Sequence, residues 1–117
     1  MNTSPDSTPA TMSASEFSAF TDKLLERIVD TLDDATGVDD AALNQGVLEI
    51  SCDNGSKIII NRHAPTQEIW IAARSGGYHF RRAAAGWQDT RSGEPLPNAL
   101  SRVLTEQTGH AVCFDLY

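Results

Sequence analysis

Cysteine and long apolar runs are both scarce in this chain. Only two of its 117 residues are cysteine, Cys52 and Cys113, and they stand far apart in no CxxC pair. Such isolated thiols are typical of reduced, packed cysteines in a reducing compartment. The N-terminus lacks a basic segment followed by an apolar run, so no secretory signal is visible and a cytoplasmic location is the default expectation. No apolar run approaches the roughly 18 residues of a membrane helix, so we expect no membrane contact of that kind.

Positive charge is scarce as well. Nine Lys and Arg residues stand against sixteen Asp and Glu, for a net charge of −7. Binding to a phosphate backbone needs clustered bases, so we expect no nucleic-acid partner. The first 53 residues hold eleven of the acids and only two bases, Lys23 and Arg27. That half of the chain should attract metal cations and basic partners and repel anionic surfaces.

Catalytic and metal-cage signatures are also missing. The chain has no GxSxG, P-loop, GxGxxG or HExxH motif. His63, His79 and His110 lie in separate segments without another His or Cys at ligand spacing, which disfavours a closed zinc or iron cage. Each reads more simply as a loop, sheet-surface or helix-end residue. We therefore expect a protein that is not an enzyme, and carboxylate oxygens that suit hard cations such as Fe³⁺, Ca²⁺ and Mn²⁺.

What is present begins with a tail and a helix start. Residues 1–11 are small, polar and proline-bearing, which predicts a disordered tail. The remaining residues, 12–117, are expected to form one domain. Ser13 and Glu16 have the S-x-x-E spacing of a capping box, which predicts that a helix begins there.

The predicted helix runs to about Asp34 and has two contrasting faces. Its apolar face repeats at three- and four-residue steps: Phe17, Phe20, Leu24, Ile28 and Leu32. At about 100° per residue the opposite face carries acids: Asp22, Glu26, Asp30 and Asp33. Like charges four residues apart destabilise a helix by a few tenths of a kcal/mol per pair, which favours some use for the charge. The plain alternative is a solvated acidic face.

Strand-like runs follow a turn that contains Gly37, Asp39 and Asp40. They span residues 47–52, 57–62, 68–74, 78–82 and 87–90. Asn54-Gly55 predicts a tight hairpin in which both turn residues have positive φ, and Gly76-Gly77 predicts another turn. A second helix has Leu96, Leu100, Val103 and Leu104 on its apolar face and Gly109 as its C-cap, and a last strand is expected around residues 111–114.

This order predicts an α+β fold. Two helices should pack on one face of an antiparallel sheet of about five to six strands, as a two-layer sandwich. Alternation directs Ile69 and Ile71 toward the core and Glu68 and Trp70 toward the open face. A Trp left exposed in the middle of a sheet indicates an interface anchor, whereas Trp87 is expected to be buried.

Several of these motifs together resemble the frataxin family in its short bacterial form. The resemblance covers about residues 13–115 and rests on motifs that keep their spacing. They are Ser15-Glu16-Phe17, Leu32-Asp33-Asp34, Asn54-Gly-Ser-Lys-Ile-Ile-Ile-Asn-Arg62, Pro65, Ile69-Trp-Ile-Ala72, Gly76-Gly-Tyr-His-Phe80, Trp87 and Arg91-Ser-Gly-Glu94. The resemblance implies the frataxin-like helix–sheet–helix sandwich already expected from the order of elements.

The resemblance also implies a function and its residues. Family members take part in iron–sulfur cluster assembly, bind iron (Fe²⁺ or Fe³⁺) weakly through an acidic ridge, and bind and regulate cysteine desulfurase. Carried over to this chain, the ridge comprises Asp22, Glu26, Asp30, Asp33, Asp34, Asp39 and Asp40. The partner-binding residues would be Asn61 and Trp70. The iron–sulfur scaffold protein is a second candidate partner, and the expected state is a monomer, with oligomerisation on iron left open.

Two alternatives stand beside this interpretation. A ferroxidase or iron-storage protein would hold two irons through Glu and Glu-x-x-His pairs, a spacing this chain lacks. A pure protein-interaction module would use the acids only to steer a basic partner. The chain also departs from the family pattern at His63, Glu68 and Ser18, which bears on the number and strength of metal sites more than on partner binding.

Overall fold

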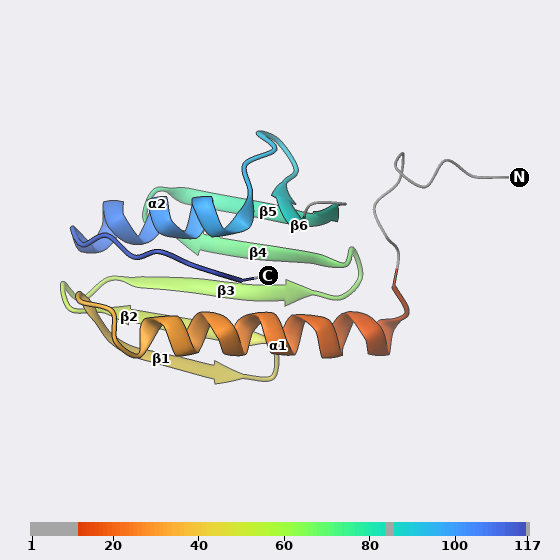
Figure 1. The fold of residues 1–117 in the computed structure, drawn as a ribbon, viewed down its shortest axis with the longest axis horizontal. Helices are drawn as coiled ribbons and strands as arrows, with labels where there is room; N and C mark the ends of the chain where they lie inside the picture. Colours follow the sequence, from red (N-terminus) through yellow and green to blue (C-terminus); the bar gives the residue numbers. More distant parts are fainter. Residues whose placement is uncertain (1–11, 84–85, 117) are drawn as a thin grey trace, which may run out of the picture.

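Two helices lie on one face of an antiparallel sheet in the computed structural model of the chain (Figure 1). The structure describes residues 12–83 and 86–116, so the tail expected at 1–11 lies outside the described residues. The elements are α1 (Ala14–Leu32), β1 (Val38–Asn44), β2 (Val47–Cys52), β3 (Lys57–His63), β4 (Glu68–Ala73), β5 (Gly76–Ala83), β6 (Gly86–Asp89) and α2 (Leu96–Thr108). The strands lie side by side in chain order. The predicted two-layer α+β sandwich is confirmed.

Helix α1 begins at the predicted capping box. The Ser13 hydroxyl accepts the Glu16 backbone N–H at 3.1 Å, and the Glu16 carboxylate accepts the Ser13 N–H at 2.9 Å. The buried face comprises Phe17, Thr21, Leu24, Leu25, Ile28 and Leu32. Phe20, which the pattern places on the apolar face, is 39 % exposed and so is not among the buried residues. The helix is rotated so that Thr21 and Leu25 replace it against the sheet, which leaves Phe20 at the edge of the apolar stripe.

The acidic turn expected before residue 47 is instead the edge strand β1. Ala41 and Leu43 pair with Ile50 and Leu48 of β2, so this short strand adds its small apolar side chains to the core. Its hairpin turn, Gln45-Gly46, has φ of 52° and 80°, the double positive-φ pattern of a type I′ turn. The local composition has low strand propensity, and pairing with the adjacent strand overrides it.

The other two predicted turns differ in detail. In the β2–β3 turn only Gly55 has positive φ (88°), so the predicted conformation of Asn54 is wrong. The side-chain amide of Asn54 points toward the end of α2, where its Nδ2 donates to the Gln107 carbonyl at 2.7 Å. The β4–β5 turn is formed by residues 74 and 75 rather than by Gly76-Gly77, since Ala73 pairs with Gly76.

Gln107 explains how these loops are held. Its side chain is buried and donates through Nε2 to the Ser56 hydroxyl (2.9 Å) and the Lys57 carbonyl (3.0 Å). Its Oε1 accepts the Arg74 backbone N–H at 3.0 Å. One polar side chain on α2 thus ties together the β2–β3 and β4–β5 turns, a long-range constraint that no local turn rule contains.

The C-terminal segment is not the strand expected at residues 111–114. It runs as irregular chain between the two helices (Figure 1). Val112 and Leu116 are buried, and the Ser101 hydroxyl donates to the Val112 carbonyl. Arg27 of α1 donates to the Asp115 carbonyl at 3.2 Å. The segment therefore fills the gap between α1 and α2 instead of extending the sheet.

Candidate functional site

Five of the seven predicted ridge residues lie on α1 and at its C-terminal end, and four of the five are exposed. Glu26, Asp30, Asp33 and Asp34 are all exposed. The last turn of the helix has no basic residue, and Asp33 is its C-cap. Negative charge at a helix C-terminus is disfavoured by the macrodipole, so these acids raise the local negative potential at a cost to the helix.

Asp22 has a structural contact instead. Its carboxylate accepts from the Arg62 guanidinium of β3 at 2.5 Å. The same guanidinium donates to the Ser18 carbonyl at 3.1 Å. Asp22 therefore helps to join α1 to the sheet, and its charge is partly compensated.

Asp39 and Asp40 lie on the edge strand and not on the helix. The strand has an irregular register between Val38 and Asp40, where Asp39 is the extra residue. Asp40 pairs with Ser51, which alternates with the buried Ile50 and Cys52. Asp40 therefore faces the open side of the sheet, away from the helical layer.

The seven carboxylates are consequently spread over two layers. Within residues 12–83 and 86–116 no group of three or more His, Cys, Asp or Glu side chains lies close enough to hold a metal ion together. Exposed oxygen donors without shared geometry fit a hydrated, loosely held hard cation and not a closed site.

The open sheet face is built around Trp70. Asn61, Trp70 and His79 are direct cross-strand partners on β3, β4 and β5. The indole is sandwiched between two imidazoles, with ring centroids 3.8 Å from His63 and 4.3 Å from His79 and interplanar angles of 9° and 8°. Trp70 is on the predicted face but is half-buried, so the expectation that it is largely exposed is wrong. The flanking rings hold it in one orientation.

Glu68 lies at the edge of the indole ring and is only 6 % exposed, although its strand position faces the open side. Its carboxylate accepts from Trp70 Nε1 (2.8 Å), Arg81 (2.8 Å) and the Thr66 hydroxyl (3.1 Å). Burial by itself opposes ionisation, but the hydrogen bonds from Trp70, Arg81 and Thr66 outweigh it and lower the pKa of the Glu68 carboxyl. The buried anion fixes the edge of the indole ring.

Sequence reasoning missed this arrangement of His63, Glu68 and His79. The signal that could have found it is the hairpin register. A two-residue turn at residues 74 and 75 places His79 opposite Trp70, whereas a turn at Gly76-Gly77 shifts the pairing. The histidines therefore appeared to be unrelated surface residues.

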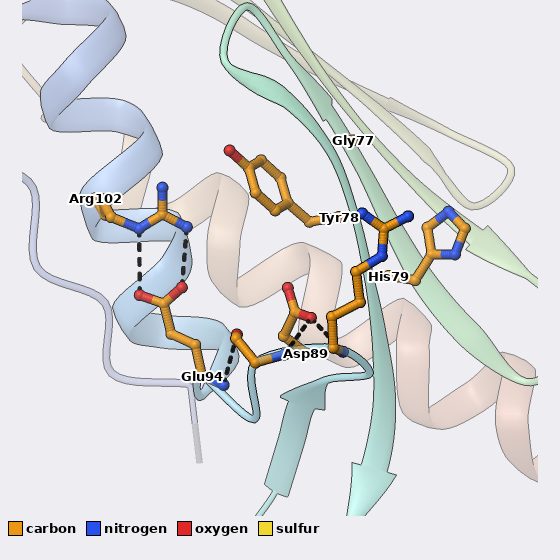
Figure 2. Close-up of a pocket in the computed structure, with 8 residues that line it drawn as sticks. Gly77, Tyr78, His79, Asp89, Glu94 and Arg102 are labelled. Carbon is orange, nitrogen blue, oxygen red and sulfur yellow. Dashed lines mark hydrogen bonds and ion pairs between the residues drawn. The ribbon is translucent and has the colours of Figure 1, made fainter.

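A hollow of about 290 Å³ adjoins the stack through His79 (Figure 2). Arg102 pairs with Glu94 at 2.9 Å and lies 5.3 Å from the Tyr78 ring centroid. The Glu94 carboxylate, followed by Tyr78, raises the pKa of the Arg102 guanidinium. Asp89 accepts the backbone N–H groups of Arg91 (2.7 Å) and Ser92 (3.1 Å). The hydrogen bonds drawn in Figure 2 thus connect lining residues to one another and stabilise the β6–α2 loop.

Two further findings bear on the class of protein. Of the helices that the structure describes, neither is long and apolar enough to cross a membrane. Cys52 is buried and Cys113 is exposed, and both are free thiols.

Comparison with known proteins gives consistent results. Residues 10–110 match the family model of the frataxin-like domain. A protein of Cupriavidus pinatubonensis named iron-sulfur cluster assembly protein CyaY is 47 % identical over 105 residues, which are 86 % of this chain and 95 % of that protein. The protein of the same name from Ralstonia nicotianae is 48 % identical and covers 83 % of this chain and 89 % of its own.

Solved structures agree with the fold. Frataxin from Psychromonas ingrahamii superposes with a TM-score of 0.81 at 30 % identity, covering 89 % of this chain and 99 % of that one. A trimeric frataxin from the yeast Saccharomyces cerevisiae, complexed with ferrous, has a TM-score of 0.63 at 20 % identity, over 88 % of this chain and 92 % of that one. The sandwich, the family-model match and these relatives lead to one conclusion: the chain belongs to the frataxin family, and it is similar along most of its length to CyaY proteins of iron–sulfur cluster assembly.

Proposed function

We propose that this protein is a non-enzymatic regulator of iron–sulfur cluster assembly that binds a cysteine desulfurase and holds iron weakly. The observation that carries the proposal is the 47 % identity to a named assembly protein across 95 % of that protein's length. Two different surfaces support it: the exposed acids of α1 and β1, and the Trp70 face. The iron–sulfur scaffold protein is a further candidate partner, and a reducing cytoplasm suits the two free thiols.

The proposed roles of the two surfaces differ physically. Exposed charge acts over distance, so Glu26, Asp30, Asp33 and Asp34 would speed encounter with a basic surface of the desulfurase. Trp70 acts only on contact, where its preoriented ring would be buried. Asn61 lies directly across from Trp70 on the neighbouring strand. Its side-chain amide would form hydrogen bonds with the same partner protein.

Iron in this proposal is cargo or a signal and not a resident cofactor. The α1 acids, with Asp39 and Asp40 on β1, are hard oxygen donors that suit Fe²⁺ or Fe³⁺. Because they share no coordination geometry within the described residues, binding should be weak and salt-sensitive. The donor set offers no paired-iron centre, so we favour a regulator over a ferroxidase or iron store.

The test is surface-binding kinetics against cysteine desulfurase. A variant with Glu26→Gln, Asp30→Asn, Asp33→Asn and Asp34→Asn should associate more slowly, and its association rate should depend less on salt. Trp70→Ala should speed dissociation about thirtyfold or more, the effect of losing ~2 kcal/mol or more at an interface hot spot. Asp22 is left intact because its ion pair with Arg62 supports the fold.

Matched controls separate specific from general effects. Glu106→Gln with Asp115→Asn removes two exposed acids elsewhere and, per charge removed, should slow association much less than the four-acid variant does. Trp70→Phe retains an aromatic ring between the histidines and should dissociate more slowly than Trp70→Ala. If a folded Trp70→Ala protein dissociates at the parental rate, the sheet face is not the anchor. If no variant binds differently, desulfurase binding by these surfaces is refuted.

A further inference from the structure

Phe20 projects from α1 as a preoriented, exposed aromatic ring. Only Phe20 and Val47 are large hydrophobic residues with exposed side chains within the described chain, each 39 % exposed. The guanidinium of Arg82, from β5, lies 4.5 Å from the Phe20 ring centroid. Phe20 also contacts Trp87: the two ring centroids are 6.3 Å apart and the ring planes are inclined at 56°. These contacts restrict the ring before any partner arrives, so the entropy cost of using it in binding is low.

Hollows lie on both sides of Phe20. The first, of about 380 Å³, is lined by Met12, Glu16, Ala19, Phe20, Lys23 and Arg82. The second, of about 170 Å³, is lined by Phe20, Lys23, Leu24, Arg27 and Leu116. Phe20 and Lys23 belong to both, so the two hollows form one surface, which we call the Phe20 groove. The first hollow is at the low end of the ~300–1,000 Å³ range of ligand pockets and the second is below it, and each is large enough for one or a few side chains.

The bases around the groove are not neutralised by the protein's own acids. Lys23, Arg27 and Arg82 form no ion pair with any residue of the described chain, although the protein carries sixteen Asp and Glu. Arg27 donates to the Asp115 backbone carbonyl, and Arg82 contacts the Met12 sulfur at 3.5 Å. The lining acid, Glu16, is committed to the capping box. The groove is therefore an electropositive, apolar surface on an acidic protein.

Helical geometry separates this surface from most, but not all, of the acids of the same helix. Lys23 and Arg27 are four residues apart and lie on the flank next to Phe20. At about 100° per residue, Glu26 and Asp33 fall toward the other flank, whereas Asp30 lies between the two flanks, about 20° from Lys23. The bases are therefore concentrated on the side of Phe20, and this side suits a partner different from the basic surface that suits the acids.

We propose that the Phe20 groove is a docking site for an acidic peptide segment with apolar side chains, presented by a partner protein. The apolar side chains enter the hollows against Phe20, and the carboxylates pair with Lys23, Arg27 and Arg82. Charge complementarity selects this occupant. An anionic membrane is disfavoured because it is an extended surface that would also meet the exposed Glu26 and Asp30, whereas a peptide segment can be confined to the groove.

The experiment is an NMR titration of the ¹⁵N-labelled full-length protein with the synthetic peptide Glu-Leu-Glu-Glu-Leu-Phe-Glu. Binding should shift the amide signals of residues 19–27, 82 and 116, and it should weaken with added salt. A peptide with Lys for every Glu, and one with Ser for every apolar residue, should each bind at least tenfold more weakly. The first tests the charge and the second tests the hollows.

Protein variants give the matched comparison. Lys23→Glu with Arg27→Glu should lower the affinity at least tenfold, because the two substitutions reverse the charge of the groove. Both side chains are exposed, so the substitutions leave the core unchanged. Arg74→Glu with Arg91→Glu makes the same net change at exposed sites elsewhere and should have little effect. Phe20→Ala should also weaken binding, and its fold is checked by its amide spectrum because it touches Trp87.

Five results would overturn the proposal, four of them from the peptide titrations. Those four are absence of peptide shifts at millimolar concentration, shifts centred on Trp70 instead of Phe20, equal weakening by both charge-reversal pairs, and equal binding of the Ser-substituted peptide. A salt-sensitive dimer of the protein alone, seen by sedimentation and lost in Lys23→Glu with Arg27→Glu, would assign the groove to the acids of a second copy and also overturn it.

Discussion

A single carboxylate shows how residue-level chemistry shapes the open sheet face. Glu68 occupies an outward strand position, yet it is 6 % exposed because Trp70, Arg81 and Thr66 surround it. A buried anion is tolerated only when hydrogen bonds replace its hydration. Here the replacement is strong enough that the pKa of the Glu68 carboxyl is lowered in spite of burial. The orientation of the Trp70 indole, and hence of the proposed anchor, depends on that charge.

This linkage predicts a pH dependence of stability. A carboxyl whose pKa is lower in the folded state stabilises the fold above its unfolded pKa of about 4.3, and that contribution is lost as pH falls through the folded pKa. Urea unfolding from pH 7 to pH 3 should therefore show a smaller acid-induced loss of free energy for Glu68→Gln than for the parent. Glu106→Gln, at an exposed site, controls for loss of one negative charge. Equal pH slopes in parent and Glu68→Gln would contradict the assignment.

Among the elements, α1 has the most varied surface, with apolar, acidic and basic sides. Its buried stripe binds the sheet, one flank is acidic, and the other holds Phe20 with Lys23 and Arg27. Its C-terminal end has acids and no base, against the preference of the helix macrodipole. Tertiary packing of the buried stripe supplies the stability that the charges reduce. The helix is thus a rigid support on which unfavourable surface charge can be carried.

Neutralising the end of α1 should separate stability from metal binding. Asp30→Asn with Asp33→Asn and Asp34→Asn relieves repulsion four residues apart and at the C-terminus, each worth a few tenths of a kcal/mol to ~1 kcal/mol. The free energy of unfolding, measured in urea, should be equal or higher, while iron titration should show weaker binding. Asp115→Asn serves as the control for one exposed acid outside the ridge. An unchanged iron titration would remove α1 from the metal proposal.

Across the whole molecule, one sheet separates two chemically different sides. The helices and the C-terminal segment cover one face of the sheet (Figure 1), and the rings of Trp70, His63 and His79 stack on the other face. Val112 and Leu116 close the core between α1 and α2. The C-terminal segment therefore contributes to the integrity of both layers, although it has no regular secondary structure.

Removing that segment should destabilise the entire domain. A chain that stops after His110 loses the burial of Val112 and Leu116, each worth about 1.5–3 kcal/mol, and the contacts to Ser101 and Arg27. Chemical unfolding should show a loss of several kcal/mol. Leu116→Ala alone should reproduce part of the loss, and Cys113→Ala, at an exposed position, should reproduce little. A truncated protein as stable as the parent would show that the segment only covers the surface.

The local pattern by itself determined the elements whose signals are short-range. The capping box at Ser13, the αL C-cap at Gly109 (φ 78°) and the inward Ile69 and Ile71 are all as predicted. So are the two-layer sandwich and the burial of Trp87, which is 1 % exposed. These features follow from dihedral preference and hydrophobic periodicity, which act over a few residues and are visible in any short window of sequence.

Only the tertiary structure decided the features that depend on distant partners. Strand β1 exists because β2 offers backbone hydrogen bonds that outweigh its poor propensity. Asn54 adopts its conformation because its amide reaches Gln107, 53 residues away along the chain. The Trp70 stack depends on strand register, and Phe20 is exposed because Thr21 and Leu25 occupy the core side of α1. In each case a contact between residues far apart in sequence stabilises the observed conformation, so the local sequence pattern could not predict it.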